Sequence, residues 1–130
     1  MEAALHPRSA LRVLIADDER HFVEMVEALL AGEDGIEVVG TARNGKEAVE
    51  RALALDPDVT LMDISMPILD GIEALRRIRA HHPKACVLVL TGSSITTDVD
   101  RSRQAGAAGF LTKDRIATHL VERILEIGER

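Results

Sequence analysis

Two short apolar segments of this 130-residue chain run directly into carboxylates. Arg12–Ala16 is followed by Asp17 and Asp18, and Val59–Met62 is followed by Asp63. Carboxylates that a fold brings together repel one another, so one or more must stay protonated unless a cation joins them. Oxygen ligands favour a hard cation, and Mg²⁺ suits such a site because it retains waters and completes its shell with phosphate oxygens.

Two later apolar segments also end in polar side chains. Thr91 closes "CVLVLT" and Lys113 closes "GFLTK". An ammonium neutralises an incoming anion, and a threonine hydroxyl hydrogen-bonds a phosphoryl oxygen. Asp63 is the candidate nucleophile, with the metal and Lys113 neutralising charge during transfer. The set therefore predicts a carboxylate that receives a phosphoryl group.

Each of these residues also has an ordinary structural explanation. An Asp after a strand is most often a turn or cap residue, and a Thr is often simply the β-branched end of a strand. A Lys near the start of a helix is usually solvated. The prediction rests on the joint arrangement at the ends of four apolar segments.

Short β-rich segments alternate with longer segments of helical periodicity along the whole chain. Asn44, Asp70 and Asp114 are expected to cap the second, third and fifth helices. Strands are predicted at Arg12–Ala16, Ile36–Gly40, Val59–Asp63, Cys86–Thr91 and Gly109–Lys113. Three helices are predicted over 45–55, over 72–80 and, weakly, over 97–105. The first and last helices are predicted from apolar residues that share one face. These residues are Phe22, Met25, Val26, Leu29 and Leu30 in the first helix, and Ile116, Leu120, Val121, Ile124 and Ile127 in the last.

Five such β–α units favour a parallel sheet with helices on both faces. The predicted fold class is α/β, a flavodoxin-like (βα)5 doubly wound parallel sheet with strand order 2-1-3-4-5. Residues 11–130 form the domain, and residues 1–10 are expected to be a flexible tail. In this order the first and third strands are neighbours where the strand order reverses, so Asp17, Asp18 and Asp63 converge there.

Composition excludes several classes of function. The net charge is −6, whereas a domain that grips nucleic acid by its phosphates shows a basic patch, so direct DNA binding is not expected. A single cysteine excludes a disulfide framework. No apolar run reaches the ~20 residues of a membrane span, and the N-terminus lacks a signal peptide. A cytoplasmic location without membrane contact is expected.

Four motifs, "LIADDE", "LMDISMPILDG", "VLTGS" and "GAAGFLTKD", resemble those of bacterial response-regulator receiver domains. Their order, spacing and strand context all agree, and the resemblance covers Leu11 to Gly128. It implies a signalling domain, not an enzyme with its own substrate, although such domains promote their own phosphorylation and dephosphorylation. It also implies a sensor histidine kinase as partner, and it is compatible with a homodimer formed on phosphorylation.

Carried over residue by residue, the resemblance implies a Mg²⁺ site around the phosphoacceptor. Asp63 accepts the phosphoryl group and is itself a metal ligand. Asp18 binds Mg²⁺ directly, Asp17 acts mainly through water, and the backbone carbonyl of Ser65 is a further ligand. Ser65 and Ser93, each two residues beyond a site residue, are small enough to leave attacking water access to the phosphoryl group.

The resemblance also implies a switch. Lys113 pairs with the phosphoryl group, and Thr91 moves to hydrogen-bond it. The second switch position, an aromatic residue on the fifth strand, is Phe110, which lacks the phenol hydroxyl of the family's frequent Tyr. Phe110 is therefore either an inward-swinging switch residue or a fixed core aromatic.

One departure from the common pattern narrows the resemblance. Many receivers have Pro after the strand-5 lysine, whereas Lys113 is followed by Asp114. This makes "GAAGFLTKD" similar to receivers of the LuxR/NarL type, which precede a DNA-binding helix-turn-helix domain that is absent here. The chain is either truncated from a transcription regulator, which we favour, or a stand-alone receiver.

Two other classes of function remain. A haloacid-dehalogenase-type phosphatase uses an Asp-x-Asp pattern, but the residue two positions after Asp63 is Ser65, so this alternative is disfavoured. A pseudo-receiver, which binds partners without being phosphorylated, is argued against by the complete set of acids, Thr and Lys. Failure to bind Mg²⁺ would favour it.

Overall fold

A five-stranded parallel sheet forms the centre of the molecule in the computed structural model, which describes residues 10–92 and 96–128. The strand order is β2-β1-β3-β4-β5, and all four neighbouring pairs are parallel. The strands are β1 Leu11–Ala16, β2 Ile36–Ala42, β3 Val59–Asp63, β4 Val87–Thr91 and β5 Gly109–Thr112. The predicted fold class and strand order are confirmed.

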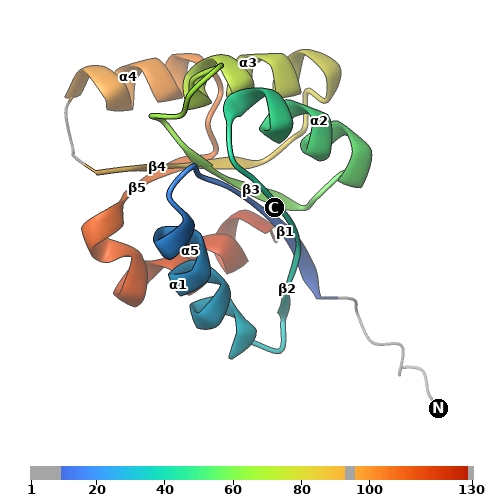
Figure 1. Ribbon diagram of the computed structural model, residues 1–130, viewed down its shortest axis with the longest axis vertical. Coiled ribbons are helices and arrows are strands. Elements are labelled where there is room, and N and C mark those ends of the chain that lie inside the picture. Colours follow the sequence, from blue (N-terminus) through green and yellow to red (C-terminus); the bar gives the residue numbers. More distant parts are fainter. Residues whose placement is uncertain (1–9, 93–95, 129–130) are drawn as a thin grey trace.

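Helices cover both faces of this sheet, with α1 and α5 on one side and α2, α3 and α4 on the other (Figure 1). They are α1 Arg20–Ala31, α2 Gly45–Leu55, α3 Gly71–His81, α4 Thr96–Gln104 and α5 Ile116–Gly128, with a 3-10 turn at Lys113–Arg115. No helix in the described ranges is long and apolar enough to cross a membrane. The expected tail, apart from Ala10, and Ser93 lie outside the described residues.

The alternation of side chains along each strand divides the core into two layers. Val13 and Ile15 of β1 face α1 and α5, whereas Leu14 and Ala16 face α2 and α3. All four side chains are at most 1% exposed. Because both sides of the sheet are buried at its centre, β3 and β4 are largely apolar runs, and a polar residue that ends such a strand stands out.

Two predicted helix caps are present. The Asn44 side chain accepts a hydrogen bond from the Glu47 backbone N–H at 2.8 Å, and Asp70 accepts one from the Glu73 N–H at 2.9 Å. Each carboxamide or carboxylate satisfies a backbone donor that has no partner within its helix. Asp70 thereby fixes the start of α3, immediately after the loop that follows Asp63.

The third expected cap is absent. Asp114 lies inside the 3-10 turn that precedes α5, and it is exposed. Met25, expected on the buried face of α1, is 48% exposed. The buried stripe of α1 follows the spacing Phe22, Val26 and Leu30, which leaves Met25 at the edge of the helix face.

Strand ends differ from the predictions by one or two residues. β1 begins one residue earlier, β2 continues to Ala42, β4 begins at Val87 and β5 ends at Thr112. Ladder pairing accounts for the longest difference, because β2 remains paired with β1 up to Ala16–Ala42, after a register shift between Val13 and Leu14. The extension brings β2 level with the end of β1, next to the acidic residues.

The weak fourth helix is present over Thr96–Gln104. Within its described side chains, the buried residue is Ser102, whose hydroxyl donates to the Asp98 carbonyl at 2.7 Å. A buried serine that hydrogen-bonds its own helix contributes less apolar area to docking than a leucine would. α4 therefore packs on the sheet with little hydrophobic support.

Candidate functional site

Three carboxylates meet at the end of β1 and β3. Asp17 follows β1 directly and Asp63 is the last residue of β3, and these strands are neighbours in the sheet. Ligand oxygens of Asp17, Asp18 and Asp63 all lie within 4.8 Å of one another. Asp17 is 1% and Asp63 5% exposed, whereas Asp18 is open to solvent. The topology brings these acids together as the sequence indicates.

The ammonium of Lys113, which follows β5, lies among these acids. Its Nζ is 2.7 Å from Asp17 Oδ2, 3.5 Å from Asp63 Oδ1 and 3.9 Å from Glu19 Oε1. Asp17 Oδ1 accepts a hydrogen bond from the Glu19 backbone N–H at 2.8 Å. Asp17 Oδ2 is buried and forms a close ion pair with Lys113.

The electrostatics of the site disfavour full ionisation of Asp63. Burial, and then the neighbouring charge of Asp17, raise the pKa of Asp63 from the ordinary 3.8 to about 6, although Lys113 opposes this rise. Burial alone would lower the pKa of Lys113, but its contacts with Asp17 and Asp63 outweigh burial and the pKa is raised. Lys113 therefore stays positively charged at neutral pH.

One ammonium does not balance three carboxylates. The excess negative charge and the oxygen-only donors are the features expected of a divalent-cation site. Ser65 is exposed and lines, with Asp18, a cavity of about 520 Å³ beside the acids. The residues present therefore fit a hard cation such as Mg²⁺.

Two glycines hold the loop between β3 and α3 against the site. A Cβ on Gly71 would lie 2.0 Å from the backbone oxygen of Asp63, and one on Gly45 would lie 1.9 Å from that of Leu69. The Gly71 N–H also donates to the Ile64 carbonyl at 2.8 Å. These close approaches require residues without side chains, and they fix the backbone that carries Asp63 and Ser65.

Thr91 ends β4, next to the strand that carries Asp63. In the ladder Asp63 pairs with Leu90, so Thr91 lies one residue further toward the acidic end of the sheet. Thr91 is 6% exposed and pairs in register with Thr112 of β5. Its position near the acids follows from the strand order, as expected.

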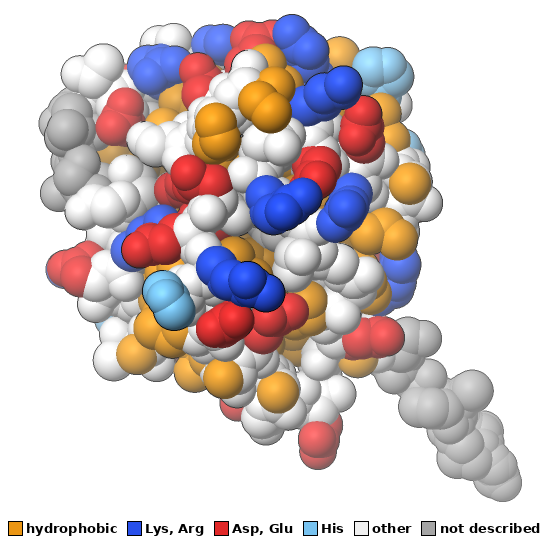
Figure 2. All heavy atoms as spheres, in the orientation of Figure 1, with side chains coloured by type: hydrophobic (Ala, Val, Ile, Leu, Met, Phe, Trp, Pro, Cys, Tyr) orange, Lys and Arg blue, Asp and Glu red, His pale blue; other side chains and the backbone are white. Residues whose placement is uncertain are grey.

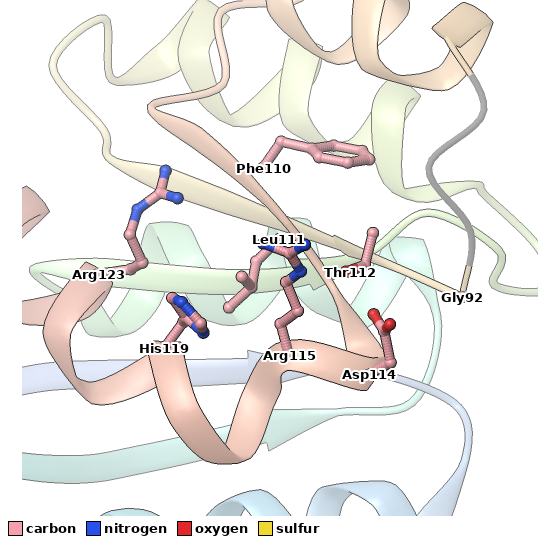
Figure 3. Close-up of a pocket in the computed structure, with 8 residues that line it drawn as sticks. All are labelled: Gly92, Phe110, Leu111, Thr112, Asp114, Arg115, His119 and Arg123. Carbon is pink, nitrogen blue, oxygen red and sulfur yellow. The ribbon is translucent and has the colours of Figure 1, made fainter.

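Phe110 lies on β5, facing the side of the sheet covered by α2 and α3. It is half-buried and packs against the core on that side, whereas Leu111 packs on the α1 and α5 side. Figure 3 shows the two side chains pointing in opposite directions from β5, with Arg115 and Arg123 rising from the segment that follows. Phe110, Arg115, His119 and Arg123 line a cavity of about 590 Å³.

Sequence reasoning assigned no site role to Phe22 or Glu19. The ring centroid of Phe22 is 4.1 Å from Lys113 Nζ, and Glu19 contributes a weaker ion pair. Phe22 has the spacing of an ordinary core residue of α1. No local signal distinguishes it, because its contact with Lys113 joins segments that lie far apart in the sequence.

Comparison with known proteins gives a consistent result. The family model for the "Response regulator receiver domain" matches residues 13–125. The chain is 40% identical over 134 residues to protein-glutamate methylesterase/protein-glutamine glutaminase 1 of Vibrio cholerae serotype O1, covering 93% of this chain and 35% of that protein. It is 35% identical over 117 residues to the transcriptional regulatory protein LnrK of Bacillus subtilis, covering 90% and 53%.

The solved structures agree. The signal receiver domain of the putative response regulator NarL from Mycobacterium tuberculosis is 34% identical, with a TM-score of 0.89 over 94% of this chain and 98% of that one. The chain spans about a third to a half of the length of the two curated relatives. The shared part is therefore one domain of each of those proteins.

Replacing Asp63 by Asn should stabilise the metal-free protein at neutral pH. Because the folded-state pKa of Asp63 is raised from 3.8 to about 6, the folded state binds more protons than the unfolded state in that window, and wild-type stability falls as pH rises through it. The cost reaches on the order of 2–3 kcal/mol. The Asn side chain does not ionise, so the free energy of unfolding of the variant does not fall in this way.

Urea unfolding with a chelator at several pH values measures the difference. The stability gain of Asp63→Asn over wild type should grow from about pH 4 to about pH 6.5 and then level off. Val26→Ala, which removes buried apolar atoms and no titratable group, is the control, and its stability difference from wild type should stay constant across the range. A gain that is constant across the range contradicts the electrostatic explanation.

Proposed function

We propose, from the premise that this chain belongs to the response regulator receiver domain family, that Asp63 accepts a phosphoryl group from a sensor histidine kinase in a Mg²⁺-dependent reaction. The observation that carries the proposal is the nearly buried Asp63 with Asp17 and Asp18 within 4.8 Å and Lys113 Nζ at 3.5 Å. This arrangement provides a nucleophilic oxygen, a set of metal ligands and a cation for the phosphoryl group.

The transfer requires an ionised Asp63. With a pKa of about 6, the carboxylate is mostly ionised at neutral pH. One of its oxygens forms a bond to phosphorus as the bond between phosphorus and the donor's nitrogen or oxygen breaks, and the donor leaves with that electron pair. Lys113 neutralises charge on the transferred group, and a divalent cation held by the three acids and the Ser65 carbonyl would supply further neutralisation when bound.

Removal of the phosphoryl group is a second displacement at the same phosphorus atom, with the Asp63 carboxylate as the leaving group. Water attacks phosphorus, the bond to the Asp63 oxygen breaks, and inorganic phosphate leaves a free carboxylate. Ser65 is exposed at the mouth of the site, and its short side chain leaves room for water. Its side chain is therefore part of what sets the lifetime of the modified state.

Phosphorylation would be transmitted through Thr91 and Lys113. The new phosphoryl oxygens offer hydrogen-bond acceptors to the Thr91 hydroxyl and draw Lys113 away from Asp17. α4 follows Thr91 and has little hydrophobic support, so its repositioning costs little. The surface formed by β4, α4, β5 and α5 is thus the element that changes contacts with a partner or a second copy, with Phe110 either moving with Thr91 or staying fixed.

The cavity of about 590 Å³ on this surface contains three basic side chains, Arg115, His119 and Arg123. Phe110 lines the same cavity, and its ring projects from the other side of β5 (Figure 3). A cavity lined by an aromatic ring and two arginines suits an interface that forms and dissolves, because aromatic and arginine side chains supply much of the energy at such contacts. We infer that this cavity is where phosphorylation is sensed by the partner.

The activity of a complete protein containing this domain is a separate proposal. The relatives differ, since one is a methylesterase and another a transcriptional regulator. The motif "GAAGFLTKD" and the likeness to NarL support a LuxR/NarL-type transcription regulator acting in the cytoplasm through a helix-turn-helix domain. Figure 2 shows acidic and basic side chains interspersed on the displayed face, which agrees with DNA contact through another domain.

The direct test is the intact mass of the protein after incubation with acetyl phosphate. A phosphoryl adduct should form in the presence of Mg²⁺, because Asp63 is the nucleophile, and should be lost when Mg²⁺ is chelated and in Asp63→Asn. Asp70→Asn serves as the control and should still form the adduct. A correctly folded wild-type protein that forms no adduct would instead favour the pseudo-receiver.

Replacing Thr91 by Ala should separate transfer from switching. The adduct should still form, because Thr91 provides no nucleophilic oxygen, but the amide NMR shifts of α4, β5 and α5 should respond much less to phosphorylation than in wild type. Thr91→Ser, which keeps the hydroxyl, is the matched control and should restore most of the response. An undiminished response in Thr91→Ala would rule out this route.

A further inference from the structure

The ammonium of Lys113 has an aromatic neighbour besides its carboxylate partners. Phe22, on α1, presents its ring with the centroid 4.1 Å from Nζ, and Nζ lies 2.7 Å from Asp17 Oδ2 and 3.5 Å from Asp63 Oδ1. The Lys113 side chain is 21% exposed and Phe22 9% exposed. The cation therefore sits between two carboxylates and an aromatic ring, with little access to solvent.

The aromatic character of Phe22 is unusual for its position in the core. The rest of the layer between the sheet and helices α1 and α5 is aliphatic, including the next residues of the same stripe, Val26 and Leu30. The chain contains two Phe and no Tyr or Trp, so one of its two aromatic rings touches the one ammonium of the acidic site. A leucine would fill similar space but lacks the negative potential of a ring face.

We propose that Phe22 is a positioning residue, which holds the Lys113 ammonium beside Asp63 through a cation–π contact while the charges around that ammonium change. When Asp63 is phosphorylated, Lys113 must exchange its close contact with Asp17 for phosphoryl oxygens. The ring is present in both arrangements and carries no proton or formal charge. It keeps the flexible lysine side chain from turning toward the solvent or toward Glu19.

Part of this inference rests on the proposed function. The contact between Phe22 and Lys113, and its electrostatic character, can be tested without phosphorylation. The effect on phosphoryl transfer applies only if Asp63 accepts the group. Two measurements therefore keep a failure of the contact distinct from a failure of the proposed function.

The first measurement is a double-mutant cycle on the unfolding equilibrium of the full chain. Phe22→Leu removes the ring face and Lys113→Met removes the charge while keeping most of the side-chain stem. The expected coupling is about threefold to tenfold in the unfolding equilibrium constant, favouring the wild-type pair. Additive effects would mean that Phe22 only fills space, and they would overturn the proposal.

The second measurement replaces Phe22 with phenylalanines that carry increasing numbers of ring fluorines, which weaken the ring's negative face with little change in size. The rate of adduct formation from acetyl phosphate should fall stepwise along the series, by roughly tenfold overall. Phe22→Tyr, which keeps the ring face, should stay close to wild type. A rate that is independent of fluorination would overturn the positioning role.

Val26→Ala is the control for general damage to α1. Val26 is fully buried on the same stripe, so its truncation destabilises the protein, but the rate of adduct formation by the folded fraction should not change. If wild type forms no adduct at all, the proposed function and the role of Phe22 in transfer fail together. The double-mutant cycle still decides whether the ring holds the ammonium.

Discussion

The excess of negative charge at the end of β1 and β3 is the constraint on which the rest of the site depends. Asp17 and Asp63 are nearly excluded from water, and one ammonium lies between them and within reach of both. Such a cluster is costly to assemble, since burial and mutual repulsion both oppose ionisation. The raised pKa of Asp63 reflects this unfavourable electrostatic energy. A divalent cation, or a bound phosphoryl group with its counter-ions, changes the net charge of the site.

The scaffold that holds this cluster is rigid where the acids attach and weakly packed where a response would be needed. β1 and β3 lie in the middle of the sheet, covered on both faces, and the glycine contacts at Gly71 and Gly45 fix the loop after Asp63. α4, in contrast, docks through a helix whose buried side chain, among those described, is Ser102. A charge change at the rigid side can therefore be relieved by movement at the weakly packed side, which lies beyond Thr91.

Much of this arrangement could be predicted from the sequence. Alternating apolar runs and helical periodicities indicate the parallel sheet, and the strand order then brings Asp17 and Asp63 together. Local patterns could not show that Phe22 touches Lys113, because that contact depends on how α1 lies against the end of β5. Asp114 illustrates the opposite error, since a residue type that favours helix caps lies in a 3-10 turn set by the tertiary path of the chain.

Calorimetric titration of the protein with Mg²⁺, in buffers of different ionisation enthalpy, tests most directly whether charge excess organises the site. At about pH 6 roughly half of Asp63 is protonated, given its pKa of about 6, so binding of one ion should release roughly half a proton. At about pH 8 the release should be near zero. No detectable binding, or a proton release that is the same at both pH values, would contradict this account of the site.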